Sequence, residues 1–170
     1  MRFVALVFVA LGLSSCGYHV SGHSDLLPKT IKTIAIPAWG NATTRYKLTD
    51  RIPEAVTREF IQRTRYQIVS DVNQADAILR GTVVNYFSSP IVFDPTTSRA
   101  SVVQISVVMS AVLVDRVTGK ELFSRPSFEV KQQYEISSDP NAFFQESDPA
   151  MTRLSKDVAR SLVSAILENF

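Results

Sequence analysis

The sequence predicts an α+β fold, a two-layer sandwich in which an antiparallel or mixed sheet of about four strands is packed on one face by two helices. Three observations support this prediction. Apolar residues recur at helical spacing between Leu48 and Phe60, extended segments rich in β-branched residues fill the middle of the chain, and a second helical repeat occupies its end. No internal repeat or low-complexity segment interrupts residues 31–170, so we expect them to form a single domain.

The first strand is expected from Ile31 to Ile36, and Pro37 ends it because proline cannot donate to a sheet ladder. The segment from Trp39 to Thr44 is expected to be a loop. Its tryptophan has two interpretations. Either the ring seals the edge of the sheet while Asn41 and Thr43 make turn hydrogen bonds, or these residues contact a partner.

The first helix is predicted for residues 51–65, and its apolar stripe consists of Leu48, Ile52, Val56 and Phe60 with Ala55 beside them. Asp50 is the expected N-cap. That cap would place Pro53 in the first turn, where no backbone donor is needed. A short strand from Tyr66 to Val69 and a turn over residues 71–74 are expected to follow.

Two long strands are predicted next. The first runs from Ala77 to Phe87, and Gly81 marks a weak point or bulge in it. The second, from Arg99 to Asp115, is the clearest strand of the chain because alternation places six apolar side chains on one face. These side chains are Val103, Ile105, Val107, Met109, Ala111 and Leu113.

A hairpin connection is expected over residues 115–120, where Gly119 is free to take a positive φ. The returning strand alternates apolar and charged residues as far as Ile136, and Pro126 in its middle suggests an edge position or a bulge. Residues 137–146 are expected to form a polar loop. The final helix then begins with Asp148 as its N-cap and Pro149 as its first residue.

The amino-terminal segment resembles a bacterial lipoprotein signal. Arg2 precedes an apolar run from Phe3 to Leu13, and two serines separate this run from Cys16, the only cysteine of the chain. The run is shorter than the roughly 20 residues that cross a bilayer. We therefore expect residues 1–15 to be removed, a covalent lipid on Cys16, and a tether over residues 16–30. The alternative is an ordinary secretory signal that leaves a free thiol.

The composition and motifs argue against an enzyme or a nucleic-acid-binding protein. The 18 basic and 16 acidic residues give a formal net charge of only +2, and this near-neutral charge argues against a general polyanion binder. His19 and His23 both lie in the expected tether, where polarity is a simpler explanation than metal binding or catalysis. Asp115, Asp139 and Asp148 occupy loop and cap positions, where carboxylates satisfy backbone donors. We expect no catalytic residue, no metal and no cofactor other than the covalent lipid.

One apolar segment asks for an explanation. Ile91, Val92 and Phe93 lie between prolines in a predicted loop over residues 88–95, at the tip of a hairpin. Leaving such side chains in water costs about 1.5–3 kcal/mol each. We expect either that the loop folds back onto the core of the domain or that a protein or lipid partner covers it.

Three basic residues are candidates for contact with a partner or a lipid. Arg99, Arg125 and Lys131 would all face the wetter side of the sheet if strict alternation holds. They form either a solvated face together with Glu121 and Glu129, or a polar surface that lies inside a partner or donates hydrogen bonds to lipid phosphates.

Several short motifs in order along the chain resemble the LptE-type lipopolysaccharide-assembly lipoproteins. They are Cys16-Gly17-Tyr18-His19-Val20, then Thr33-Ile34-Ala35-Ile36-Pro37 and Asn41-Ala42-Thr43, then Ala75-Asp76-Ala77-Ile78-Leu79-Arg80-Gly81-Thr82-Val83. The resemblance spans nearly the whole chain after the signal. Only the cysteine-containing start and the motif from Ala75 to Gly81 are moderately specific.

The resemblance implies a non-catalytic outer-membrane lipoprotein on the periplasmic side. Its partner would be a large transmembrane β-barrel, in whose lumen it sits as a plug, and it would assist delivery of lipopolysaccharide and touch this lipid. Gly17 after the cysteine, in place of Asp, agrees with the outer membrane. Two alternatives remain: a binding module or pilot for another envelope complex, and a lipid carrier with an apolar cavity.

Overall fold

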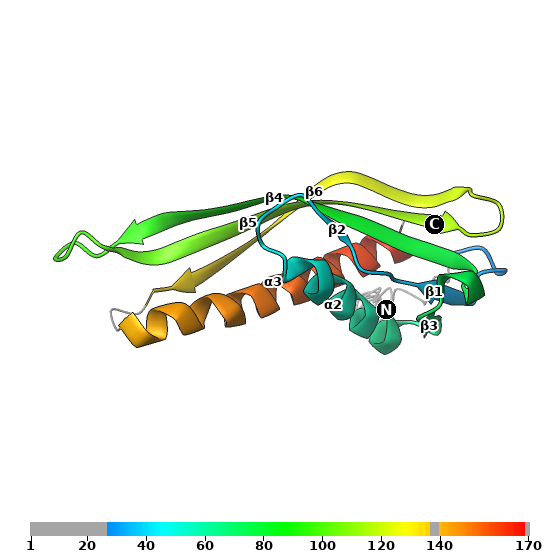
Figure 1. Cartoon of the computed structure of the whole chain (residues 1–170), viewed down its shortest axis with the longest axis horizontal. Helices are drawn as coiled ribbons and strands as arrows, with labels where there is room; N and C mark the ends of the chain where they lie inside the picture. Colours follow the sequence, from blue (N-terminus) through cyan, green and yellow to red (C-terminus); the bar gives the residue numbers. More distant parts are fainter. Residues whose placement is uncertain (1–26, 137–139, 169–170) are drawn as a thin grey trace, which may run out of the picture.

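A long sheet forms one layer of the molecule and two helices form the other (Figure 1). This computed structural model describes residues 27–136 and 140–168, with side chains in the second range from Asp148 onward. The helices are α2 (Leu48–Arg63) and α3 (Pro140–Glu168), which pack against each other and lie on the same side of the sheet. The predicted α+β sandwich is therefore confirmed.

Within the described residues, six strands make up the sheet, where about four were expected. They are β1 (Thr33–Ala35), β2 (Gly40–Asn41), β3 (Gln67–Val69), β4 (Ala77–Phe93), β5 (Ala100–Asp115) and β6 (Glu121–Glu135). The order is β3-β1-β4-β5-β6, and β2 also pairs with β4. The sheet is mixed, because β1 and β2 run parallel to their neighbours whereas β4, β5 and β6 are antiparallel. The strand without a predicted counterpart is β2, which lies in the segment expected to be a loop.

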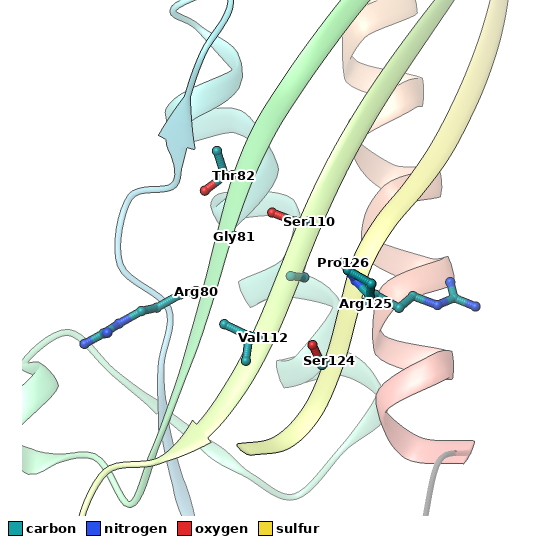
Figure 2. A pocket seen from close by; sticks show the side chains of 9 residues that line it. Arg80, Gly81, Thr82, Ser110, Val112, Ser124, Arg125 and Pro126 are labelled. Carbon is teal, nitrogen blue, oxygen red and sulfur yellow. The ribbon is translucent and has the colours of Figure 1, made fainter. Parts of the chain in front are cut away.

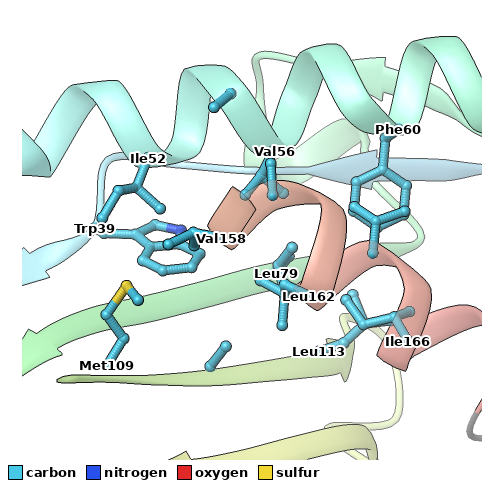
Figure 3. Close-up of a cluster of buried hydrophobic side chains, with 14 of the residues drawn as sticks. Trp39, Ile52, Val56, Phe60, Leu79, Met109, Leu113, Val158, Leu162 and Ile166 are labelled. Carbon is cyan, nitrogen blue, oxygen red and sulfur yellow. The ribbon is translucent and has the colours of Figure 1, made fainter. Parts of the chain in front are cut away.

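The inward face of β5 is the face that the alternation predicted. All six of the apolar side chains assigned to it are buried. All except Val103 belong to one core cluster with residues of α2 and α3, and Figure 3 shows Met109 and Leu113 below Val56 of α2 and Leu162 of α3. Leu27, assigned from the sequence to the tether, is also buried, so the packed domain begins no later than this residue.

The predicted start of the first helix is wrong. α2 begins at Leu48 after Lys47, and Asp50 lies in the first turn instead of capping the helix. Pro53 is consequently inside the helix and cannot donate to the carbonyl of Thr49, four residues earlier. That carbonyl accepts the backbone N–H of Trp39 instead, at 3.2 Å. The hydrogen bond lost to proline is thus replaced by one from the preceding loop.

Trp39 is a core residue, with only 2% of its surface exposed. Its ring lies between Ile52 of α2 and Met109 of β5 in Figure 3, which agrees with a sealing role. A Cβ atom added to Gly81 would overlap the indole ring. The bulge suggested at Gly81 is not found there, because Gly81 pairs in register with Ala111. The register shift lies further on, between Val83 and Asn85. The glycine allows the close approach of the ring.

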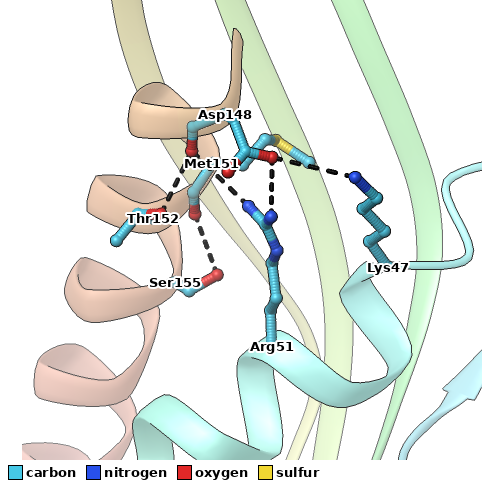
Figure 4. Close-up of polar contacts among 6 residues, drawn as sticks. All are labelled: Lys47, Arg51, Asp148, Met151, Thr152 and Ser155. Atoms are coloured by element: carbon cyan, nitrogen blue, oxygen red, sulfur yellow. Dashed lines mark hydrogen bonds and ion pairs between the residues drawn. The ribbon is translucent and has the colours of Figure 1, made fainter. Parts of the chain in front are cut away.

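The final helix also begins earlier than predicted. α3 starts at Pro140, so Pro149 is inside it and Asp148 is not its N-cap. Most of the predicted loop over residues 137–146 is accordingly helical, although residues 137–139, including Asp139, lie outside the described residues. Asp148 joins the two helices: its carboxylate lies 2.6 Å from the Arg51 guanidinium and 4.0 Å from Lys47 Nζ (Figure 4).

The second hairpin connection follows the prediction. Asp115 accepts the backbone N–H groups of Val117 and Thr118 at 2.9 and 2.8 Å, and Gly119 has φ of 71°. Both features are the ordinary chemistry of a tight turn, in which a carboxylate satisfies backbone donors and glycine supplies the left-handed conformation.

Asp76 fastens β1 to the start of β4. One of its carboxylate oxygens accepts the backbone N–H groups of Lys32 and Thr33, at 2.8 and 2.9 Å, and its own N–H donates to the Thr33 hydroxyl. The two backbone donors hold the pKa of the Asp76 carboxyl below its ordinary value. This aspartate belongs to the family-like motif from Ala75 to Val83, and it therefore has a structural role.

Gly81→Ala is expected to lower the free energy of unfolding by about 1–3 kcal/mol, because the added methyl group overpacks against Trp39. Urea unfolding of the full chain in detergent measures this change. Trp39→Ala alone removes a large buried ring and should cost about 3–5 kcal/mol. In that background Gly81→Ala should cost almost nothing. An equal cost in both backgrounds would show that the indole is not the reason for glycine.

Asp76→Ala is expected to lower the free energy of unfolding at pH 7 by about 2 kcal/mol, because two backbone donors lose a charged acceptor. The pKa of this carboxyl is lower in the folded chain than in the unfolded chain. Its contribution is therefore present above the unfolded value of about 4 and is lost as pH falls through the folded value. The difference in unfolding free energy between wild type and variant should therefore be smaller near pH 3 than at pH 7. A difference independent of pH would contradict the assignment.

Candidate interaction surface

Large apolar side chains are exposed along the far half of β4. They are Val84, Phe87, Ile91, Val92 and Phe93, and their exposed fractions run from 41% for Ile91 to 57% for Phe93. All lie beyond Val83, the last residue of β4 that pairs with β2. We call the part of β4 and β5 from Val84 to Gln104 the distal hairpin. Its green tip extends past the orange first turn of α3 in Figure 1.

The structure changes the expected setting of Ile91, Val92 and Phe93. They belong to β4 and not to a loop, because the strand continues through Ser88, Ser89 and Pro90. Register shifts beside Pro90 and Val92 accommodate the irregular sequence. The interpretation that these residues fold back onto the core is wrong, since all three are exposed. Their apolar surface is available for a partner.

The connection at the tip is short and held by one carboxylate. Asp94 accepts the backbone N–H groups of Thr96 and Thr97, both at 2.8 Å, and these bonds hold its pKa below the ordinary value. The backbone N–H of Asp94 donates to the carbonyl of Arg99 at 2.8 Å. Arg99 is exposed and forms no ion pair with any described residue. The tip therefore presents an exposed guanidinium one residue before Ala100, which pairs in register with Phe93.

Lys131 lies on the outer face of the sheet, the face opposite the helices, as the alternation predicted. It is paired in register with Ser106, and its Nζ lies 3.3 Å from a carboxylate oxygen of Glu129. The Ser106 hydroxyl donates to the other oxygen. This hydroxyl, and then Lys131, lower the pKa of the Glu129 carboxyl. The charge of Lys131 is therefore balanced within the sheet itself.

Arg125 does not lie on the outer face, where Lys131 lies. A register shift separates the pair Met109↔Phe128 from the pair Ala111↔Arg125, so Arg125 falls opposite an inward-facing residue. Its guanidinium lies 6.0 Å from the centre of the Phe128 ring, and Figure 2 shows the side chain extending past the edge of β6. Pro126 accounts for the shift, because β6 is an edge strand with a bulge here, as predicted.

A hollow of about 170 Å³ lies on the outer face above Gly81. Hydroxyl groups of Thr82, Ser110 and Ser124 line it, with Arg80 and Arg125 at its margins (Figure 2). Sites that enclose a drug-sized ligand have volumes of about 300–1,000 Å³. The hollow therefore suits water or one small polar group.

Other candidate sites from the sequence cannot be placed. Cys16, His19 and His23 lie outside the described residues. In the described part of the chain, no cluster of three or more potential metal ligands occurs. No helix there combines the length and the apolar character needed to cross a membrane.

The model of the LptE family, described as lipopolysaccharide-assembly, matches residues 31–166. This chain belongs to the LptE family. The match covers the whole described domain except its first residues and its last turn, and it confirms the resemblance seen in the motifs. The chain is thus a lipopolysaccharide-assembly protein, and it is not an enzyme. A search among curated proteins finds no match.

Solved structures show the same fold at low sequence identity. Lipoprotein B of Nitrosomonas europaea is 16% identical with a TM-score of 0.57, covering 88% of this chain and 91% of that chain. A minor lipoprotein of Acinetobacter baumannii is 14% identical with a TM-score of 0.55, covering 84% and 95%. The rare lipoprotein B of Shewanella oneidensis is 14% identical with a TM-score of 0.52, covering 81% and 92%.

Sequence reasoning missed two members of the exposed strip of this LptE-family chain. The sequence pattern places Phe87 and Val84 in a strand but does not indicate that their side chains are exposed. The bulge between Val83 and Asn85 places Val84 outside the regular alternation. A run of uncharged residues longer than one strand needs was the available signal.

Proposed function

We propose that this LptE-family protein is an outer-membrane lipoprotein, tied to the membrane by acyl chains on Cys16, whose domain lies on the periplasmic side. It plugs a large β-barrel that translocates lipopolysaccharide, helps that barrel to assemble, and assists delivery of the lipid to the cell surface. The observation that carries the proposal is the family match over residues 31–166. The exposed strip of the distal hairpin supports it.

The shape of the domain suits a role as a plug. An elongated sheet with helices on one face leaves its outer face and its distal hairpin open to contact (Figure 1). The outer face carries internally balanced charges, such as Lys131 with Glu129, which can enter a polar lumen without leaving a bare charge. The distal hairpin offers Ile91, Val92, Phe93 and Arg99 as contacts for a partner or a lipid, whereas Arg125 is a weaker candidate.

Purification of the tagged full chain from detergent-solubilised membranes tests the proposal against its alternatives. A large β-barrel protein should copurify in equal amounts. Copurification of a different envelope complex would indicate a pilot or binding module. Native mass spectrometry of the purified chain tests the carrier, because a carrier holds one non-covalent acyl ligand in each molecule.

Cys16→Ser is expected to abolish covalent lipid attachment, because serine offers no thiol for acyl transfer at this position. Growth with labelled palmitate, followed by purification of the full chain, measures the label on wild type and variant. The matched control, Ser15→Ala, keeps the cysteine and a small preceding residue, and it should remain labelled. Label on the Cys16→Ser chain, or a wild-type protein that retains residues 1–15, would contradict the anchor.

Ile91→Asp and Phe93→Asp are each expected to reduce copurification of the barrel at least tenfold. Both side chains are exposed, so the free energy of unfolding of the purified full chain should change by no more than about 0.5 kcal/mol. Val117→Asp is the matched control, because Val117 is 77% exposed in the connection between β5 and β6, at the opposite end of the sheet. Undiminished copurification would exclude these residues as contacts, and a large loss of stability would assign them to the core.

A further inference from the structure

The distal half of β4 is a sheet edge. Beyond Val83, β5 pairs with one side of β4, and no described strand pairs with the other side. The last contact from β2 is the backbone N–H of Ala42, which donates to the carbonyl of Val83 at 2.9 Å. The Asn41 side chain then accepts the N–H of Thr43 at 2.8 Å and turns the chain away. From Asn85 to Phe93 no described strand lies beside this edge, although the Arg45 guanidinium lies 4.9 Å from the centre of the Tyr86 ring.

An edge of this composition is a hazard. Unpaired backbone groups on a strand are a template for another strand, and natural proteins often place charged residues there to prevent pairing. The run from Thr82 to Phe93 contains no charged residue and is rich in aromatic and β-branched side chains. Segments of this kind associate readily when their backbone is accessible. Some other feature must keep this edge from pairing.

The register shows which backbone donors point outward. In an antiparallel pair, alternate residues direct their N–H groups toward the partner strand and away from it. Tyr86, Ser88 and Pro90 face Val107, Ile105 and Val103, so all three share one orientation. Pro90 has no N–H to give to β5, and the ladder continues past it. The N–H of Tyr86 donates to its neighbour's side chain, Asn85 Oδ1, at 2.8 Å. Both facts place this set of donors on the open edge.

We infer that the open edge of β4 between Asn85 and Pro90 is closed to strand addition. Of the three outward positions between Asn85 and Pro90, Tyr86 has its donor occupied by Asn85 and Pro90 has none, so Ser88 alone offers a donor in this stretch. A single donor does not support a ladder. The register shifts beside Pro90 and Val92 distort the edge further. The inference holds whichever partner the proposed function has.

The opposite edge of the sheet has a comparable set of protections. β6 carries Pro126 at a bulge and the charged residues Glu129, Lys131 and Glu135 beyond it. Proline, bulges and charges are all known means of protecting an edge. Each of the two long edge segments thus contains one proline near its middle, but only β6 adds charges. On β4, the uncharged side chains remain free to contact a partner.

The test restores the two missing donors. Asn85→Ala frees the N–H of Tyr86, and Pro90→Ala adds an N–H at the second position. The purified full chain in detergent is followed by size-exclusion chromatography with light scattering over a hundredfold range of concentration. Wild type should remain monomeric. The double variant should associate, with at least a tenfold lower midpoint concentration than either single variant.

Two further measurements keep the outcome decisive. Pro95→Ala adds a backbone donor in the connection at the tip, off the edge, and should stay monomeric like wild type. Hydrogen exchange should show that the new amide at residue 90 and the amide of Tyr86 become protected when the double variant associates. If the double variant does not fold, Pro90→Ala alone carries the test. A folded variant that stays monomeric at every concentration, or association without protection of these amides, would overturn the inference.

Discussion

The contact between Trp39 and the backbone of Gly81 holds the domain together, because it joins three segments that are distant in sequence. The indole ring fills the space between α2 and the sheet. The backbone N–H of Trp39 donates to the Thr49 carbonyl, which Pro53 leaves without a donor. Any larger side chain at position 81 would push the ring away. The packing of α2 against this part of the sheet depends on this close approach.

This arrangement divides the long hairpin into a covered half and an open half. Near Trp39, β4 has β2 on its free side and α2 beneath it. Beyond Val83 the chain turns away through Asn41, and β4 continues without that neighbour among the described residues. The apolar strip begins at this point. An interaction surface therefore arises here because the covering segments stop while the strand continues, and no separate structural element is needed to build it.

The sequence predicts those features of this fold that depend on local periodicity. The inward face of β5 from Val103 to Leu113 follows from alternation alone, because both neighbouring strands pair with it over most of its length. The predicted helix starts were wrong, because an aspartate before a proline fits either an N-cap or a position inside the first turns. Asp50 and Asp148 both precede a proline and suggest helix starts, but α2 begins at Leu48 and α3 at Pro140, before these residues. One bulge at Pro126 moved Arg125 to the other face, which no alternation could reveal.

The candidate surface was located by its composition and misassigned in its conformation, for a physical reason. Ser88, Ser89 and Pro90 have the chemistry of a turn, and only the register with β5 shows that the strand passes through them. On an open edge, proline is compatible with a strand because the missing N–H faces away from the ladder. The same residue that suggested a loop thus marks the outward side of β4. An apolar, uncharged strand can stay exposed without self-association only if its backbone cannot recruit another strand, and Pro90 with Asn85 meets that requirement without adding charge to the strand.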